Sequence, residues 1–504
     1  MTYDDAHRSG RRSSVWNASD QIGIVMATTI NRRIAVFLAM AALVLSIPAV
    51  ALAGVPGAPT GLSATAGDTQ VALTWVAPVD NGGGGGITTY NVEYSVNAGA
   101  SWALVVRAVD TAVSYTATSL VNGTSYLFRV SAVNGADASS PSTSVSATPF
   151  VVHTAGDLAA YSACPINVIP LAGFTDTSST DVDCIKYYGI TKGTTATTYS
   201  PLADVTRWQM ALFLTRMANR ASITLPDGSA QGFTDIASES DEIKTAINQI
   251  KQLGITVGKT ATTYAPADNV TREEMALFIS RLLELASSGP GGNTELGSGS
   301  SLYRVIKSID PDYNFTDITQ GTYEVRDAIV NLWNLGVTDV QTGTLYEPTV
   351  DMTRQAMATF MAGALAHTNT RPEGLILQPS SYRLQNGFSV SMSVTHRTDG
   401  FLPIVGSVVD TFRFNHSIVS TVTRFDSIGN CTSSISASQV GNTKCTVDTS
   451  DPVTDSDGNL VVFTEVPPTA NKVDLWAWTA STVTVYDNDL NAAEASKVTV
   501  ETYP

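Results

Sequence analysis

Residues 233–278 read FTDIASESDEIKTAINQIKQLGITVGKTATTYAPADNVTREEMALF, and much of this pattern occurs three times between residues 170 and 368. When the three copies are aligned on one glycine, the same six residue types follow at the same offsets without a gap. The aligned residues are Gly189, Gly254 and Gly336, then Tyr199, Tyr264 and Tyr346, Pro201, Pro266 and Pro348, Thr206-Arg207, Thr271-Arg272 and Thr353-Arg354, Met210, Met275 and Met357, and Phe213, Phe278 and Phe360. Such a repeated pattern indicates an array of similar structural units.

Each copy is expected to form a helix, a loop and a second helix. In the second copy an apolar residue recurs at helical spacing, at Ile243, Ile247, Ile250 and Leu253. Gly254 then ends this helix as a C-terminal cap. Thr271 opens the second helix with Glu274 three residues later, which is the pattern of a capping box. Because one helix pair cannot bury its own apolar face, the three copies are predicted to pack on one another.

The three copies differ in length. They lie at about residues 170–220, 230–286 and 310–368. Each begins with Phe-Thr-Asp, and from this Phe to the aligned glycine the first copy spans 15 positions (174 to 189) and the second 21 (233 to 254). The first helix of the first copy is therefore expected to be shorter. A Ser/Gly-rich run between the second and third copies, Ser287–Ser301, predicts a flexible insert.

This arrangement resembles the S-layer homology family, whose modules anchor bacterial surface proteins to the cell wall. The family signature combines Phe-x-Asp, a first helix ending in Leu-Gly-Ile, a loop with an aromatic residue and Pro, and Thr-Arg-Ala-Glu at the second helix. The second copy matches it with Phe233-Thr-Asp, Leu253-Gly-Ile, Tyr264-x-Pro266 and Thr271-Arg-Glu-Glu274. The resemblance implies an all-α prism of three repeats over residues 155–372, whose grooves hold an acidic, often pyruvylated cell-wall polysaccharide.

An arginine follows the N-cap threonine in every copy, at Arg207, Arg272 and Arg354. The first turn of a helix presents free backbone N–H groups and the positive end of the helix dipole, which favour an anion. A guanidinium group binds a carboxylate through two parallel hydrogen bonds, so these arginines suit a pyruvyl ketal or a uronic acid. The residues alone favour pairing with a nearby Asp or Glu that ties the repeats together. The family resemblance favours glycan binding instead.

The copies differ around these arginines. The loop glycine four residues after the aligned one is Gly193 in the first copy and Gly258 in the second, and the resemblance places both in the glycan site. The third copy has Val340 there. The third residue after the N-cap is Gln209, Glu274 and Ala356 in the three copies in turn. We therefore predict that glycan binding depends most on the arginine of the second copy, less on that of the first and least on that of the third.

A β-rich segment precedes the repeats. Residues 54–150 alternate apolar and polar residues in short runs separated by turn signals. The segment resembles a fibronectin type III domain, which is an all-β sandwich. In that fold Trp75 would be the core tryptophan and Tyr126 the corner tyrosine.

A second β-rich segment, residues 373–504, follows the repeats and looks like the immunoglobulin-like sandwiches of bacterial surface proteins. Trp476 and Trp478 alternate on one strand there. Such residues usually pack in a core, although the spacing also suits stacking on sugars. Asp455–Asn459 departs from the calcium-loop template, so a turn is predicted and no metal site is expected.

Residues 1–53 are predicted to be an N-terminal extension and a signal peptide. Two arginines precede an apolar run that closes in Ala51-Leu-Ala53, which is typical of cleavage before Gly54. The alternative is a membrane anchor, but the run is near the lower length limit for a span and a small-residue cleavage site follows it. Met26 is a candidate start of the chain. No membrane segment is expected after cleavage.

The charge and the cysteines suit an exported protein. The formal net charge is −16, which argues against nucleic-acid binding. Four cysteines form two local pairs, Cys164/Cys184 and Cys431/Cys445. An even count in an exported chain favours disulfides, and local pairing is predicted because each pair falls within one domain. Metal binding is the weaker alternative, since there is no Cys-x-x-Cys spacing.

Catalytic motifs are lacking in the sequence. None of the five histidines sits in a Gly-x-Ser-x-Gly, His-Glu-x-x-His or Cys/His context. Carboxylates are plentiful, but no segment has the layered pattern of a catalytic domain. The sequence predicts a secreted, non-catalytic cell-wall or S-layer protein that needs no cofactor, binds wall polysaccharide and can self-assemble. The alternatives are an adhesin whose β domains bind another cell or matrix, and an extracellular polysaccharide hydrolase.

Overall fold

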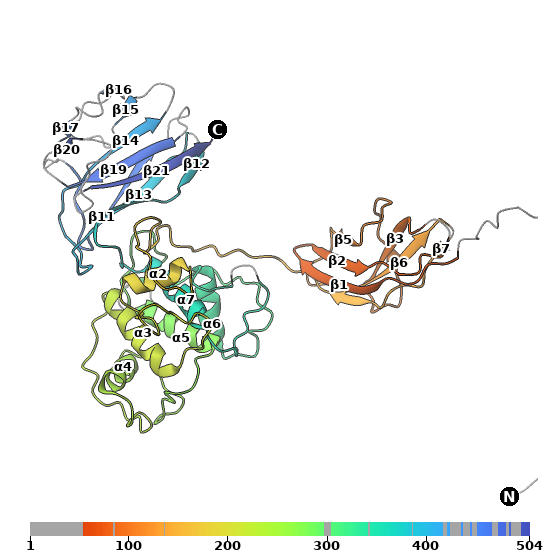
Figure 1. The fold of residues 1–504 in the computed structure, drawn as a ribbon, viewed down its shortest axis with the longest axis horizontal. Coiled ribbons are helices and arrows are strands. Elements are labelled where there is room, and N and C mark those ends of the chain that lie inside the picture. The colour runs from red at the N-terminus through yellow and green to blue at the C-terminus, as the bar shows by residue number, and fades with distance from the viewer. Residues whose placement is uncertain are drawn as a thin grey trace, which may run out of the picture. The chain divides into compact units, whose positions relative to one another are not determined.

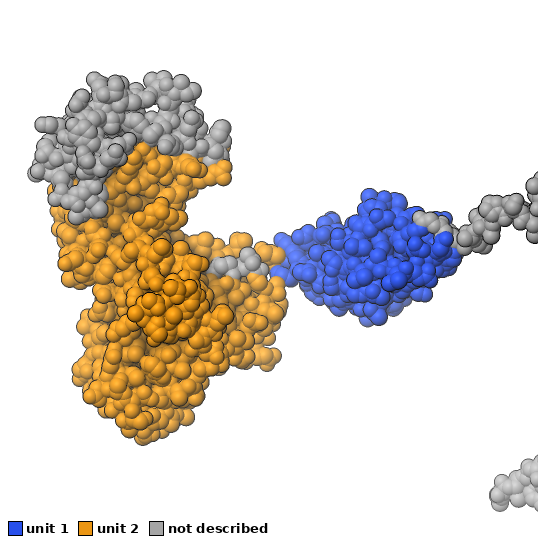
Figure 2. All heavy atoms as spheres, viewed as in Figure 1, with its two compact units in different colours: residues 1–150 blue, residues 151–504 orange. Residues whose placement is uncertain are grey.

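The structure is a computed structural model, and its contacts divide the chain into two compact units, residues 1–150 and 151–504 (Figure 2). It describes residues 54–503 except for 84–85, 136, 297–303, 341–342, 386, 417–420, 424–434, 437–443, 446–450, 466–471, 480–482 and 485–494. The predicted signal peptide lies outside the described residues. Each unit is described by itself below.

The first unit is a β-sandwich of two sheets (Figure 1). One sheet has the strand order β1-β2-β5, and the other has the order β4-β3-β6-β7 with β8 paired to β6. The bounds are β1 Thr60–Gly67, β2 Gln70–Val76, β3 Thr89–Ser95, β4 Ala103–Leu104, β5 Ser114–Ala117, β6 Tyr126–Asn134, β7 Asp137–Ala138 and β8 Val145–Ala147. Every second residue of β2 is buried, as expected for a strand with one face in the core.

Two aromatic residues of this unit take the places that the sequence predicts. Trp75 is buried and makes an edge contact with Tyr90, with 5.3 Å between the ring centroids. The Tyr126 hydroxyl accepts a hydrogen bond of 3.0 Å from the backbone N–H of Val121, five residues upstream. This bond is the tyrosine corner of such sandwiches. The predicted fibronectin type III sandwich is therefore confirmed for this unit.

The second unit begins with three consecutive helix pairs, α2–α3, α4–α5 and α6–α7 (Figure 1). The bounds are α2 Thr180–Tyr187, α3 Arg207–Arg220, α4 Asp241–Gln252, α5 Arg272–Leu285, α6 Tyr323–Asn334 and α7 Arg354–His367, with the short strands β9 Glu295–Leu296 and β10 Arg304–Val305 between α5 and α6. The shorter first helix is confirmed, since α2 has 8 residues and α4 has 12. Gly254 follows α4 with a φ of 74°, and Thr271 and Glu274 form the predicted capping box.

The three helix pairs close into a ring. The backbone N–H of Val205 donates to the oxygen of Met352 (2.9 Å), that of Met352 to Val270 (2.7 Å), and that of Val270 to Val205 (2.9 Å). Around this centre α3 packs against α4, α5 against α6, and α7 against α2. Because the third copy contacts the first, each copy buries its apolar face against a neighbour.

The Ser/Gly-rich run after α5 does not behave as the predicted flexible insert where it is described. Residues 287–296 pack against the end of α7. The backbone N–H of Gly289 donates to the His367 oxygen (2.9 Å), and that of Asn293 donates to His367 Nδ1 (3.1 Å). A Cβ on Gly289 would lie 2.1 Å from a backbone oxygen. For residues 287–296 the prediction was wrong, because small residues also permit close packing, which composition alone does not show; residues 297–301 lie outside the described residues.

His367 gives the second unit a pH dependence. It is fully buried, and because its Nδ1 accepts from Asn293, its Nε2–H donates to the Leu335 oxygen (2.8 Å). Burial lowers the pKa of His367 below its usual 6.5. The unfolded chain therefore binds the extra proton, and the free energy of unfolding falls as the pH drops below about 6.5. Denaturant unfolding measured between about pH 5 and pH 8 should show that the free energy of unfolding of His367→Gln depends less on pH than that of the native chain. The same pH dependence in both proteins would mean that His367 is not the group responsible.

One predicted disulfide is present. Cys164 and Cys184 are bonded, with 5.7 Å between their Cα atoms. The bond fastens the segment before the first copy to α2, and the Tyr188 hydroxyl donates to the Ala163 oxygen beside it (2.6 Å). For the second predicted pair, Cys431 and the side chain of Cys445 lie outside the described residues.

Removing this disulfide should destabilise the second unit. The bond closes a loop with a sequence separation of 20, so Cys164→Ala/Cys184→Ala should lower the free energy of unfolding by roughly 3 kcal/mol. Denaturant titration of the oxidised protein and the double variant measures the difference. The reduced native chain and the reduced double variant serve as the control pair, and the two should have the same stability. A variant as stable as the oxidised protein would show that the bond constrains little.

The C-terminal part of the second unit consists of two larger sheets around an apolar core that includes Leu377, Val394 and Leu475. The strand orders are β11-β13-β18 and β12-β21-β19-β14-β15-β16, and β17 pairs with β20. The bounds are β11 Gly374–Pro379, β12 Arg383–Gln385, β13 Ser389–Arg397, β14 Asp410–His416, β15 Thr421–Thr423, β16 Ile435–Ser436, β17 Lys444–Cys445, β18 Asn459–Glu465, β19 Lys472–Trp478, β20 Val483–Thr484 and β21 Ala495–Tyr503. Trp476 is 3% exposed, so it does not offer a surface for sugars; the Trp478 side chain lies outside the described residues.

A buried polar junction joins the helices to these sheets. Arg371, four residues after α7, is 1% exposed and donates to backbone oxygens at the end of that helix. Arg397 in β13 is also buried and donates to the side-chain oxygen of Asn369 (2.9 Å). The Phe401 ring lies against Tyr188, with 5.2 Å between the centroids. Charged and aromatic side chains from both parts thus form one continuous contact.

Candidate functional site

Each predicted arginine is the first residue of its helix and reaches across to the next copy. The Nε atoms of Arg207, Arg272 and Arg354 donate to the backbone oxygens of Tyr264, Tyr346 and Tyr199 at 2.8, 2.7 and 2.7 Å. The tyrosine hydroxyls donate back to the arginine backbone oxygens at 2.8, 3.1 and 2.7 Å. Each guanidinium also lies over its tyrosine ring, which is a favourable cation–π contact. We call these three places arginine sites 1, 2 and 3, in the order of the arginines.

The aspartate of each Phe-Thr-Asp motif holds the tyrosine of its copy in place. Asp176 accepts from the backbone N–H groups of Tyr199 (2.8 Å) and Ser200 (2.7 Å). These bonds, led by that from Tyr199, lower the pKa of Asp176, so the carboxylate is ionised at neutral pH. Ser200 has a left-handed backbone with a φ of 58°, and the equivalent Ala265 and Glu347 have the same φ. The motif therefore shapes the loop that receives the arginine.

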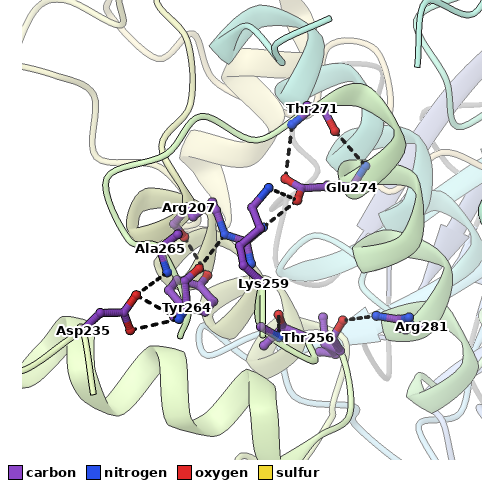
Figure 3. A network of polar contacts seen from close by, with 11 residues as sticks. Arg207, Asp235, Thr256, Lys259, Tyr264, Ala265, Thr271, Glu274 and Arg281 are labelled. Carbon is purple, nitrogen blue, oxygen red and sulfur yellow. Dashed lines mark hydrogen bonds and ion pairs between the residues drawn. The ribbon is translucent and has the colours of Figure 1, made fainter. Parts of the chain in front are cut away.

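At arginine site 1 a carboxylate of the chain already contacts the guanidinium. Glu274 Oε1 lies 3.0 Å from Arg207 Nη1 and 2.7 Å from Lys259 Nζ (Figure 3). The other oxygen of Glu274 accepts from the backbone N–H of Thr271 (3.4 Å). One glutamate therefore completes the cap of α5 and neutralises the arginine of the preceding copy.

At arginine site 2 an aspartate occupies the whole guanidinium fork. Arg272 Nη1 and Nη2 donate to Oδ2 and Oδ1 of Asp339 at 2.7 and 2.6 Å. Burial alone would lower the pKa of Arg272, but the hydrogen bond and the charge of Asp339 outweigh it and raise that pKa. These are the two parallel bonds that the family resemblance assigns to a glycan, whereas the residues alone favour such a pairing with a nearby Asp or Glu. In this structure Arg272 ties the second copy to the third.

Arginine site 3 differs from the other two. Arg354 is 3% exposed, and within the described part of the chain its two terminal nitrogens have no Asp or Glu partner. Burial lowers its pKa, and the nearby Tyr199 and Asp176 offset this only in part. A buried charge without a counter-ion is costly, so an anion arriving from outside gains most here.

Two sequence positions explain the difference. Three residues after the aligned glycine the copies have Lys192, Val257 and Asp339. At the third residue of the second helix they have Gln209, Glu274 and Ala356. Site 3 combines α7 with the first copy, which has Lys192 in its loop and Gln209 in α3, so neither of the two positions supplies an anion. The carboxamide oxygen of Gln209 accepts from the backbone N–H of Thr206 instead (3.3 Å).

Gly193 and Gly258 are required by the loop itself. Their φ values are 86° and 85°, in the left-handed region that favours glycine. A Cβ would lie 2.5 Å from the Phe174 ring in one case and 2.6 Å from the Phe233 ring in the other. Both glycines therefore let the loop fold over the first aromatic residue of the motif. Their contact with a glycan stays a prediction.

The three arginines are predictable from the sequence repeat, but the carboxylates that bind Arg207 and Arg272 were not predicted. Glu274 was assigned to a helix cap and taken as a sign that the second copy binds glycan, and Asp339 was not considered. A comparison of the copies at every offset would have shown a carboxylate at 339 where the first copy has a lysine. The receiving carbonyls of the three tyrosines carry no signal in the side-chain sequence.

The described residues contain neither a metal-binding cluster nor a membrane-spanning helix. No group of three or more His, Cys, Asp or Glu side chains in that part of the chain is arranged to hold a metal ion. Among the helices described, none is both long and apolar enough to cross a membrane.

Family comparisons identify two modules in the chain. Residues 57–148 match the fibronectin type III domain, and residues 232–276 match the S-layer homology domain. The second match starts beside the Phe-Thr-Asp motif of the second copy and ends in α5, so it contains both Lys259 and Glu274. An S-layer homology domain associates the chain with a cell surface or cell wall.

Individual relatives also match only part of this chain. Exoglucanase A of Cellulomonas fimi is 39% identical over 124 residues, which cover 24% of this chain and 13% of that enzyme. A fibronectin-type-III-like protein from Clostridium thermocellum is 30% identical and covers 18% of this chain and 92% of its own, with a TM-score of 0.16. Domains A168–A170 of titin are 34% identical over 19% of this chain and 32% of that one, with a TM-score of 0.18.

Proposed function

We propose that this chain is a secreted cell-surface protein that residues 155–372 hold on the cell wall by binding an acidic polysaccharide. In this proposal all three helix pairs are S-layer homology repeats that together form a three-lobed prism. The family match of the second pair and the arginine–tyrosine exchange common to all three support it. The fibronectin type III domain and the C-terminal sheets, proposed as an immunoglobulin-like domain over residues 373–504, act as spacers or contact surfaces.

Arginine site 3 is the observation on which the proposal depends. At sites 1 and 2 the carboxylates of Glu274 and Asp339 lie beside the terminal guanidinium nitrogens, so a carboxylate fits this geometry. Site 3 has the same arginine, the same tyrosine carbonyl and the same aspartate-held loop. Among the described residues, no carboxylate contacts the terminal nitrogens of its arginine. A pyruvyl ketal or a uronic acid of the wall polymer would supply one through two parallel hydrogen bonds to Arg354.

This proposal reverses the order that the sequence predicts for the three arginines. Arg354 becomes the principal ligand residue, with Gly193 in the loop of its site. Arg207 and Arg272 become ties between copies, because each already has an anion. The departures of the third copy, Val340 and Ala356, count for less than expected, since site 3 takes its loop from the first copy.

A polysaccharide hydrolase is the second candidate, because an exoglucanase shares a segment with this chain. That segment is 13% of the enzyme, so its activity does not transfer with the match. We therefore propose a non-catalytic protein. Incubating the purified chain with soluble and insoluble glucans tests this point, and release of reducing sugar would favour the hydrolase.

Cosedimentation with purified wall sacculi tests the anchoring proposal. The full chain should pellet with native sacculi and remain in solution with sacculi from which acid hydrolysis has removed the acidic polysaccharide. The control is a pyruvate-free or uronate-free wall fraction with the peptidoglycan intact. Equal binding to native sacculi and to acid-treated sacculi would mean that the acidic polymer is not the ligand. An adhesin would instead bind neither preparation.

A further inference from the structure

Strand β18 (Asn459–Glu465) lies at an edge of its sheet. It pairs with β13 along all seven residues, and among the strands that the structure describes it has no other partner. Val461 and Phe463 are 43% and 69% exposed and alternate with Leu460 and Val462, which pack on the core. The strand therefore presents a free edge beside an exposed apolar strip.

Two other edge strands of the protein carry features that hinder further pairing. Strand β1 has an irregular register between Thr60 and Ser63, and β11 ends in Pro379. Strand β18 contains neither proline nor lysine, and its pairing with β13 has no irregularity. Its only charge is Glu465 at the end. An edge of this kind is suited to receive another strand.

We propose that β18 pairs with β18 of a second copy of this chain, antiparallel and around a two-fold axis. The two sheets β11-β13-β18 then become one continuous sheet. With the axis at Val462 every residue of the strand has a partner. The opposed pairs are Val461 with Phe463, Leu460 with Thr464, and Asn459 with Glu465.

The residues that would face each other favour this register over its neighbours. They also favour a second copy of the same chain as the partner. In the register centred on Val462 no like charges are opposed, and the aromatic side chain of Phe463 covers Val461 of the other copy. A shift of two residues one way opposes Glu465 and Asp457, which are both acidic. The same shift the other way carries the partner of Asn459 beyond Glu465, where β18 ends. The strand is therefore complementary to itself in one register.

Sedimentation equilibrium of the full chain tests the association. A single strand pair buries little area, so a monomer–dimer equilibrium should be visible over roughly 1–100 µM. Phe463→Lys should raise the dissociation constant at least about tenfold, because it places an ammonium group against an apolar side chain of the partner. Val106→Lys, at a residue 94% exposed in the first unit, is the control and should change nothing. A native chain that stays monomeric throughout, or a Phe463→Lys variant that dimerises as well as the native chain, overturns the proposal.

Cysteine cross-linking tests the register separately. Val461→Cys and Phe463→Cys are made in two chains that carry tags of different size. Directly opposed residues bring their Cβ atoms within disulfide range, so the mixture should give a mixed disulfide dimer and neither variant alone should give one. Cross-linking of Val461→Cys with itself would mean another register. A dimer in sedimentation with no cross-link in the mixture would place the interface elsewhere.

Discussion

Replacing Arg354 with alanine should weaken binding to acidic wall polysaccharide by roughly ten- to a hundredfold, because a charge-assisted contact contributes about 1.5–3 kcal/mol. Among the arginines of the three sites, Arg354 is the one whose terminal nitrogens meet no carboxylate in the described part of the chain. Arg354→Lys should bind nearly as poorly, since an ammonium group cannot reproduce the planar fork. Added salt should weaken binding only in part, because buried charges are screened less than exposed ones. Calorimetric titration of the full chain with wall-polymer fragments measures each affinity.

Arg272→Ala is the matched control for this experiment. It removes an arginine from the same helix position in the neighbouring copy, where Asp339 already fills both donor positions. The affinity for polysaccharide should change little, while the free energy of unfolding falls because Asp339 loses its partner. If Arg272→Ala lost binding in a folded protein and Arg354→Ala kept it, the ligand would lie at arginine site 2 and our assignment would be wrong.

The repeat predicted most of the helical architecture. The spacing of apolar residues predicted helix α4, and the aligned glycine predicted where it ends. Thr271 and Glu274 predicted where α5 begins. These signals are local, because each depends on residues within one or two helical turns. The shortened α2 could be predicted from a difference in spacing for the same reason.

The predicted ranking of the arginines did not follow from such local signals. It compared residues within each copy, whereas every site combines an arginine from one copy with the loop of the next. Only the closed ring shows that Arg354 faces the loop of the first copy, which supplies Lys192 rather than Asp339. The packing of residues 287–296 was missed for a similar reason, since the contact of Gly289 with the end of α7 joins residues far apart in sequence.

The second large effect is expected at the junction between the helices and the C-terminal sheets. Arg371→Met should lower the free energy of unfolding of the second unit by about 3 kcal/mol or more. Arg371 is 1% exposed. Its terminal nitrogens donate to the backbone oxygens of Thr368 (2.8 Å), Thr370 (2.6 Å), Pro290 (3.1 Å) and Ala366 (3.1 Å). Three of these oxygens lie at or just beyond the end of α7, where the helix dipole also favours a cation.

Two opposing effects decide the size of this loss. Burial lowers the pKa of Arg371 from 12.5 to about 10, so the residue is still charged at neutral pH. A shift of that size corresponds to a cost of about 3 kcal/mol for keeping the charge inside. Four hydrogen bonds from a charged donor contribute about 1.5–3 kcal/mol each, and methionine would leave all four oxygens without this donor. The hydrogen bonds therefore outweigh the cost of burial.

Guanidinium chloride unfolding followed by the helical far-UV signal measures the loss, because all described helices belong to the second unit. Lys192→Met, at an exposed residue, is the control for removing a positive charge and should change the free energy of unfolding by less than about 0.5 kcal/mol. Arg371→Lys should fall between Arg371→Met and the native chain, since one ammonium group donates fewer of the four bonds. An Arg371→Met variant as stable as the native chain would show that packing alone holds the junction, and that relief of the buried charge offsets the lost hydrogen bonds.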